Sequence, residues 1–222
     1  MKDRLSTGLA RLDKCIEGGF EKGIITEIYG EPGSGKTNLV LFTSIKSTEV
    51  GKVIFIDTEG VSTERISQMT GDESSLSNLK FFRIRSYEEQ LESVPKIINL
   101  IQSMSDVVLL VFDTITVHYR AEREIRAELR KKTSNTLITQ IEMLNNIALS
   151  KNIPVILVNQ VYMDRTTSEV QPVGGSALSH MAKAIFRLQK LGGGRRELVV
   201  VKHRSISEDV KCSFVITENG IE

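Results

Sequence analysis

The chain has 222 residues, of which 40% are hydrophobic and 26% charged, proportions typical of a globular protein with a sizeable core. Its formal net charge of +1 argues neither for nor against a polyanionic partner, so a nucleic-acid surface would have to be a local patch. The longest apolar runs, such as VVLLVF, are far shorter than the ~20 residues needed to cross a bilayer, and the charged start MKDRLS lacks a signal-peptide core. We therefore expect a cytoplasmic protein that does not contact membranes.

The two cysteines, Cys15 and Cys212, lie far apart in the sequence and show no CxxC spacing. This pattern predicts reduced thiols of a cytosolic protein rather than a disulfide or a metal site.

Short β-branched runs alternate along the chain with longer helical patterns. Most of the runs are apolar on both faces, which is typical of parallel strands covered by helices on both sides. The sequence therefore predicts an α/β fold with a wound, mostly parallel sheet. The predicted strands are Ile24–Tyr29, Val53–Asp57, Leu79–Ile84, Val107–Asp113 and Pro154–Asn159, and the predicted helices are Lys36–Thr48, Thr63–Thr70, Tyr87–Ser103 and a long helix that ends near Ser150.

The C-terminal part changes character. Strand-like runs at Ala184–Gln189, Glu197–Lys202 and Val210–Ile216 are separated by the turns LGGGRR and RSISED. They predict an antiparallel extension of the same sheet, so we expect residues 1–222 to form one domain.

The stretch GEPGSGKT matches G-x-x-x-x-G-K-[ST] directly after a predicted strand and before a predicted helix. Its glycines let backbone N–H groups wrap a phosphate, and the helix N-terminus adds partial positive charge. Lys36 would reach the β- and γ-phosphates, while the Thr37 hydroxyl would ligate Mg²⁺. The predicted nucleotide contacts are Gly30, Glu31, Pro32, Gly33, Ser34, Gly35, Lys36, Thr37 and Asn38.

Three polar positions follow the predicted strands. Asp113 ends a buried strand at the edge where wound sheets place ligands, and it can hold Mg²⁺ together with Thr37. Glu59, in FIDTEG, is either a general base for an attacking water or a turn acid without chemistry. Gln160 either senses the γ-phosphate or is simply a polar residue at the end of a core strand.

Taken together, STGLARLDKCIEGGFEKGIITEIYGEPGSGKT, FIDTEG, VVLLVFDTIT, IPVILVNQV and PVGGSALSH resemble the RecA-type recombinase core over nearly the whole chain. The opening phrases are closest to the archaeal and eukaryotic recombinases, and among these to the archaeal RadB paralogues, which consist of the core alone. The resemblance implies an ATP- and Mg²⁺-binding protein of DNA recombination and repair.

By motif, the resemblance makes Glu59 the catalytic glutamate and Gln160 the sensor of the γ-phosphate. Arg65, in EGVSTERI, is similar to the arginine that stacks on adenine, although this segment is one residue shorter than the recombinase pattern EGxxxxER. In the recombinases, the loops after Asp113 and Gln160 hold DNA.

The first of these loops, HYRAEREIRAELRKK, is dense in basic residues that would neutralise phosphates. Interleaved acids such as Glu122 and Glu124 fit a solvated helix equally well. Tyr119 either stacks on a base or packs in the core. The DNA-binding candidates are Arg120, Arg123, Arg126, Arg130, Lys131 and Lys132, with Arg165 in the second loop.

In VVVKHRS, Lys202 and Arg204 lie two residues apart, on one face of a strand. They are either finger residues that reach the nucleotide of a neighbouring subunit, as in the wider superfamily, or charges that protect an edge strand.

The recombinases carry an N-terminal helix-hairpin-helix domain and a docking linker, and we expect neither here. The resemblance then implies an accessory protein that binds DNA, preferably single-stranded, modulates the main recombinase, hydrolyses ATP weakly and performs no autonomous strand exchange. Formation of a homo-oligomer is left open. The alternatives are a KaiC-like signalling ATPase and an ATP-gated adaptor, neither of which would need DNA.

Overall fold

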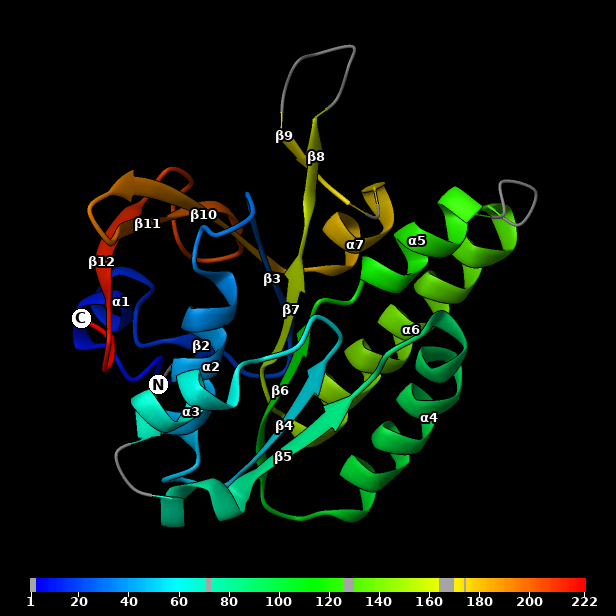
Figure 1. The fold of residues 1–222 in the computed structure, drawn as a ribbon, viewed down its shortest axis with the longest axis horizontal. Helices are drawn as coiled ribbons and strands as arrows, with labels where there is room; N and C mark the ends of the chain where they lie inside the picture. Colours follow the sequence, from blue (N-terminus) through cyan, green and yellow to red (C-terminus); the bar gives the residue numbers. More distant parts are fainter. Residues whose placement is uncertain (1–2, 71–72, 126–129, 164–169, 174) are drawn as a thin grey trace.

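The computed structural model describes residues 3–70, 73–125, 130–163, 170–173 and 175–222 (Figure 1). Side chains are not described at 73–75, 123, 125, 130–132, 163, 170 and 175–177. The strands are β1 (Arg4–Leu5), β2 (Phe20–Glu21), β3 (Ile25–Gly30), β4 (Lys52–Asp57), β5 (Leu79–Arg83), β6 (Val107–Asp113), β7 (Val155–Asn159), β8 (Val161–Met163), β9 (Val170–Pro172), β10 (Ala184–Gly192), β11 (Arg195–His203), β12 (Lys211–Thr217) and β13 (Gly220–Ile221). The α-helices are α1 (Ala10–Cys15), α2 (Lys36–Ser47), α3 (Thr63–Thr70), α4 (Tyr87–Ser103), α5 (Val117–Ile125), α6 (Arg130–Lys151) and α7 (Gly175–Met181), and a 3-10 helix spans Glu73–Asn78.

A nine-stranded sheet forms the centre of the molecule, in the order β13-β12-β11-β10-β3-β7-β6-β4-β5. Strands β10, β3, β7, β6, β4 and β5 are parallel to one another, whereas β11, β12 and β13 continue the sheet in antiparallel fashion. The predicted α/β fold is confirmed. One detail was wrong: the first C-terminal strand, β10, pairs with β3 in parallel, so the antiparallel part begins at β11.

Helices cover both faces of the sheet, with α2 and α3 on one face and α4, α5 and α6 on the other (Figure 1). Alternate residues of β4 show why both layers are needed: Val53 and Phe55 belong to the core on the α2 side, while Ile54 and Ile56 belong to the core on the α4 side. All four side chains are fully buried. The continuous apolar runs in the sequence therefore mark strands that are buried on both faces.

The predicted boundaries of the central elements agree closely with the structure. Helices Thr63–Thr70 and Tyr87–Ser103 and strand Val107–Asp113 are as predicted. The predicted strands that correspond to β4, β5 and β7 differ by one residue at one end, and the strand that corresponds to β3 by one residue at each end. The elements that were not predicted are the short ones: β1, β2, α1, the β8–β9 ribbon, α7 and β13.

Cys15, at the end of α1, and Cys212, in β12, form a disulfide with their Cα atoms 6.1 Å apart. The prediction of reduced thiols is therefore wrong. The two cysteines are 197 residues apart in the sequence, so the sequence alone gives no sign that β12 lies beside α1.

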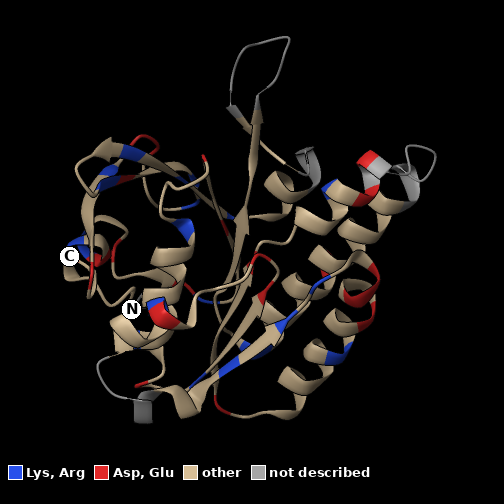
Figure 2. Ribbon diagram, viewed as in Figure 1, with Lys and Arg blue, Asp and Glu red and all other residues tan. Residues whose placement is uncertain are grey.

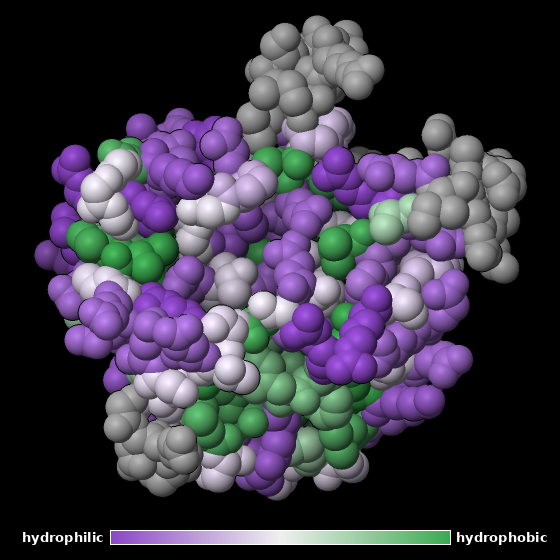
Figure 3. Space-filling view, in the orientation of Figure 1, coloured by the Kyte–Doolittle hydropathy of each residue, from purple (hydrophilic) through white to green (hydrophobic). Residues whose placement is uncertain are grey.

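Strand β5 is one edge of the sheet and combines apolar and basic surface. Phe81 is 38% exposed, and an apolar area gathers around this strand in the lower part of the face in Figure 3. Basic residues lie along the same strand, while acids lie on neighbouring helices (Figure 2). Among the described residues, no helix has the length and hydrophobicity to cross a membrane.

Candidate nucleotide site

The loop between β3 and α2 has the backbone geometry that the GEPGSGKT motif predicts. Gly33 and Gly35 have φ values of 71° and 99°, in the left-handed region that favours glycine, and Gly35 is the N-cap of α2. The loop therefore turns back over the first residues of the helix, where the partial positive charge of the helix dipole favours an anion.

Lys36 is held by the loop that precedes it. Its Nζ donates to the carbonyl oxygen of Gly30 at 2.8 Å and to that of Glu31 at 3.1 Å. Burial lowers its pKa, whereas the nearby Asp113 and Glu59 oppose that shift. The ammonium thus lies at the loop before α2, where its partners are uncharged carbonyl oxygens that leave its positive charge unneutralised.

Asp113 and Thr37 place a carboxylate and a hydroxyl together beside this loop. Asp113 is 1% exposed, and burial raises its pKa to about 7, while a hydrogen bond from the Thr37 side chain opposes the shift. Its Oδ1 atom is buried and has no hydrogen-bond partner among the described residues. A carboxylate and a hydroxyl are ligands that suit Mg²⁺, which keeps several waters and phosphate oxygens besides. In the described part of the chain, no group of three or more His, Cys, Asp or Glu residues could hold a metal.

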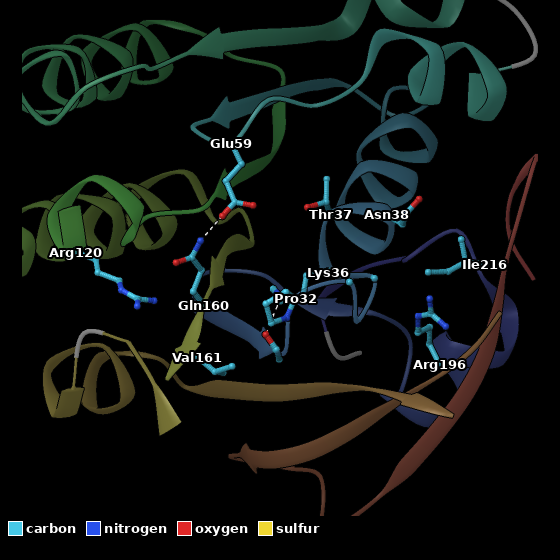
Figure 4. Close-up of a pocket in the computed structure, with 13 residues that line it drawn as sticks. Pro32, Lys36, Thr37, Asn38, Glu59, Arg120, Gln160, Val161, Arg196 and Ile216 are labelled. Atoms are coloured by element: carbon cyan, nitrogen blue, oxygen red, sulfur yellow. Dashed lines mark hydrogen bonds between the residues drawn. The ribbon is translucent and has the colours of Figure 1, made fainter. Parts of the chain in front are cut away.

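Glu59 and Gln160 meet at one end of the cavity (Figure 4). The Oε1 atom of Glu59 accepts hydrogen bonds from Gln160 Nε2 and from the Thr114 hydroxyl. The structure therefore brings together the two residues for which catalytic and sensing roles are expected.

Asp57 holds the turn that presents Glu59. Its carboxylate accepts the backbone N–H groups of Glu59, Gly60 and Val61 at 3.1, 2.7 and 3.0 Å. Arg83, on edge strand β5, donates to the same carboxylate at 3.0 Å. The position of Glu59 thus depends on a buried acid and on an arginine at the sheet edge.

Asn159, next to Gln160, is fully buried and links the sheet to the segment beyond the cavity. Its side-chain nitrogen donates to Glu27 Oε1 at 2.7 Å and to the carbonyl oxygen of Val173 at 2.6 Å. Its oxygen accepts from Thr116 at 2.7 Å. Burial raises the pKa of Glu27 to about 7, against the opposing effects of Asn159 and Lys202.

Lys36, Thr37, Glu59 and Gln160 line a cavity of about 470 Å³, whereas Asp113 does not line it. Glu59, Gln160 and Arg120 line one end, and Arg196 and Ile216 line the other (Figure 4). Arg196, Ile216 and Val161 were not predicted as site residues: Arg196 and Ile216 lie in no recognisable motif, and Val161 ends the segment IPVILVNQV without a polar side chain to mark it. Of the predicted contacts, the cavity lining includes Gly30, Pro32, Gly33, Gly35, Lys36, Thr37 and Asn38. Glu31 is exposed at the loop, and Ser34 is buried with its hydroxyl unpaired among the described residues.

Arg65 is connected to the site through Asn38. Its Nε donates to Asn38 Oδ1 at 2.7 Å, and its other nitrogens donate to the carbonyl oxygens of Glu218 and Gly220 at 2.7 and 3.3 Å. These bonds use the edge of the guanidinium and leave its faces available for stacking on a ring.

Most of the DNA-binding candidates fall where the structure does not describe side chains. Arg126 and Arg165 lie outside the described residues, and the side chains of Arg123, Arg130, Lys131 and Lys132 are not described. Arg120 lines the cavity and pairs with Glu124 at 3.1 Å. Tyr119 is 2% exposed and packs edge-on against Tyr87, so the core alternative is confirmed. Glu122 is buried, which the interpretation as a solvated helix did not predict.

The two finger candidates have partners within the chain. Lys202 Nζ donates to the carbonyl oxygens of Ser179 and Ala182, at 2.7 and 2.8 Å. Arg204 forms an ion pair with Glu21 of β2.

Comparison with known proteins places this geometry in a family. Residues 3–222 match the family described as Rad51. A DNA repair and recombination protein RadB from Methanococcoides burtonii is 37% identical over 100% of this chain and 98% of its own length, and one from Thermococcus kodakarensis is 39% identical over 98% of each. A crystal structure of the RadB recombinase superposes with a TM-score of 0.83 at 38% identity, covering 98% of both chains. The chain belongs to the Rad51 family.

Proposed function

We propose that this protein binds ATP with Mg²⁺ and acts as a DNA-binding accessory protein in homologous recombination and DNA repair. The observation that carries the proposal is the convergence of Lys36, Thr37, Glu59 and Gln160 on one cavity, with the buried Asp113 beside it and hydrogen-bonded to Thr37. The similarity to DNA repair and recombination proteins RadB supports the role in repair.

In this proposal, Lys36 exchanges its two carbonyl partners for phosphate oxygens. Thr37 and Asp113 hold Mg²⁺, which when bound neutralises charge on the β- and γ-phosphates. Glu59 orients the attacking water and accepts its proton, and Gln160 donates to the γ-phosphate in place of Glu59. Arg65 stacks on the adenine.

Hydrolysis to ADP and phosphate is expected to be weak. If Lys202 and Arg204 act on the nucleotide of a second copy, they must first leave Ala182, Ser179 and Glu21. If these contacts do not break, the positive charges of Lys202 and Arg204 cannot stabilise the transition state of hydrolysis.

DNA binding is assigned to Arg120, Arg123, Arg126, Arg130, Lys131, Lys132 and Arg165, and single-stranded DNA is the preferred form. Phosphate contacts of this kind give an affinity that falls steeply with salt. The main recombinase of the same cell is the proposed protein partner.

The test is ATPase activity measured with and without single-stranded DNA, together with the mass of the assembly in each condition. We expect slow turnover, and DNA binding that weakens with salt and when Arg130, Lys131 and Lys132 are replaced together by alanine. Hexamers that do not bind DNA would contradict the proposal and favour a signalling ATPase. Repair activity that survives Glu59→Gln but is lost in Lys36→Ala would favour an ATP-gated adaptor.

A further inference from the structure

The wall of the cavity opposite Glu59 is built by the antiparallel strands. Arg196 of β11 and Ile216 of β12 line it (Figure 4). A Cβ placed on Gly35 would lie 2.6 Å from Ile216 Cδ1 and 3.5 Å from Arg196 Nε. Both side chains therefore lie directly against the N-cap of α2, where the helix N-terminus favours phosphate.

Arg196 has donor capacity that the protein does not use. Its Nε is buried and has no hydrogen-bond partner among the described residues, and Nη1 donates to the carbonyl oxygen of Arg195 at 3.0 Å. Leaving a buried charged donor unpaired is unfavourable, and an oxygen ligand in the cavity would relieve that cost.

The same hairpin places a second cation near the loop. Lys190, the cross-strand partner of Arg196, has its Nζ 3.0 Å from the position of a Cβ on Gly33. Lys190 does not line the cavity, but its charge contributes to lowering the pKa of Lys36. The loop is thus flanked by cations whose mutual repulsion an anion would reduce.

We infer that Arg196 binds the nucleotide in cis, through the α-phosphate and ribose oxygens, while Ile216 packs against the base. This inference rests on the proposed function. It also sets the direction of the nucleotide: the γ-phosphate points toward Glu59 and Gln160, and the nucleoside toward β11 and β12. Because the α-phosphate and ribose are common to ATP and ADP, the contribution of Arg196 is the same for both nucleotides.

The experiment is calorimetric titration of Mg·ATP and Mg·ADP into the wild type, Arg196→Gln and Arg195→Gln. Arg195 is a matched control because it is adjacent, carries the same charge, is exposed and does not line the cavity. We expect Arg196→Gln to weaken both nucleotides by about tenfold, as for loss of a charged hydrogen bond, and Arg195→Gln to change neither by more than about twofold. Ile216→Ala, which leaves the charge intact, is expected to give a smaller and equal loss for both.

Unchanged binding by Arg196→Gln would overturn the inference, as would equal weakening by both arginine variants or weakening of ATP alone. A thermal melt without nucleotide verifies that Arg196→Gln is folded. If the wild type binds neither nucleotide, the proposed function itself fails, which distinguishes that outcome from failure of the inference alone.

Discussion

The two ends of the nucleotide cavity are built in different ways. At the end with Glu59, the functional residues stand at or just after the carboxyl ends of neighbouring parallel strands: Asp113 ends β6, Glu59 follows β4 and Gln160 follows β7. At the other end, Arg196 and Ile216 come from the antiparallel strands β11 and β12.

This difference shows how topology and register contribute separately to one site. Parallel strands bring their carboxyl ends to one edge whatever their side chains, so short motifs after them must meet. The place of Arg196 instead depends on the register of β11 against β10 and β12, where it faces Lys190 and Phe214. The topology of the parallel strands thus places the candidate catalytic residues, whereas the register of the antiparallel strands places the two residues that we propose contact the nucleoside.

The largest expected effect is at the loop that both ends share. Lys36→Ala removes the cation that we propose exchanges its carbonyl partners for phosphate oxygens, and it is expected to weaken Mg·ATP binding by at least about 100-fold, as for the loss of two charge-assisted bonds to phosphate. Lys46→Ala, at the exposed end of the same helix, is the control and should bind as the wild type does. Comparable calorimetric affinities for the two variants would contradict the account.

Glu59→Gln separates catalysis from binding at the first end. The amide cannot accept a proton from water, so the hydrolysis rate is expected to fall by about 100-fold or more, while the affinity for Mg·ATP stays within about threefold of wild type. Single-turnover hydrolysis and calorimetry measure the two quantities. A rate close to that of wild type would show that Glu59 is a turn acid.

Glu27 gives a pH test of the network behind Gln160. Since burial raises its pKa to about 7 from 4.5, the folded protein holds this proton at pH values where the unfolded chain has lost it. The free energy of unfolding should therefore fall as pH rises from about 5 to about 7, with Glu27 contributing on the order of 2 kcal/mol, and Asp113 acting in the same direction.

Glu27→Gln is expected to match the wild type at pH 5, where the glutamate is neutral, and to lose less stability by pH 8. Urea denaturation at pH 5, 6, 7 and 8 measures this. Parallel stability profiles for the two proteins would show that Glu27 is ionised throughout.

The smallest predicted effect tests whether the sheet edge positions Glu59. Asp57→Asn replaces one acceptor oxygen by an NH₂ group. This donor would then face another donor, either Arg83 or the backbone N–H groups. We expect kcat to fall roughly tenfold through misplacement of Glu59, with KM nearly unchanged. Lys80→Met removes an exposed charge from β5, the strand that carries Arg83, and serves as the control. A change in KM alone would assign Asp57 to nucleotide binding instead.

The central fold, and the residues that meet around Glu59, could be predicted because their signals are local. Apolar runs such as VVLLVFD mark strands buried on both faces, and GEPGSGKT needs only its flanking strand and helix to be interpreted. The short elements β1, β2 and α1 carry too few residues to show a period, so the pattern did not reveal them.

The remaining features depend on contacts between distant segments. Cys15 and Cys212 meet only because β12 returns beside α1, and Arg196 reaches the cavity only through strand register. The sequence left Arg204 as either a finger residue or a charge that protects an edge strand, and it gave no sign of the ion pair with Glu21 of β2. None of these contacts has a signal in local composition or spacing.

The most direct test of the account is calorimetric titration of Mg·ATP into the wild-type protein at pH 7.5–8, above the pKa of about 7 of Asp113. We predict a saturable heat with one nucleotide per chain that disappears when Mg²⁺ is withheld or Asp113 is replaced by alanine. The absence of any binding heat, or binding that is indifferent to both magnesium and Asp113, would contradict the assignment of this cavity.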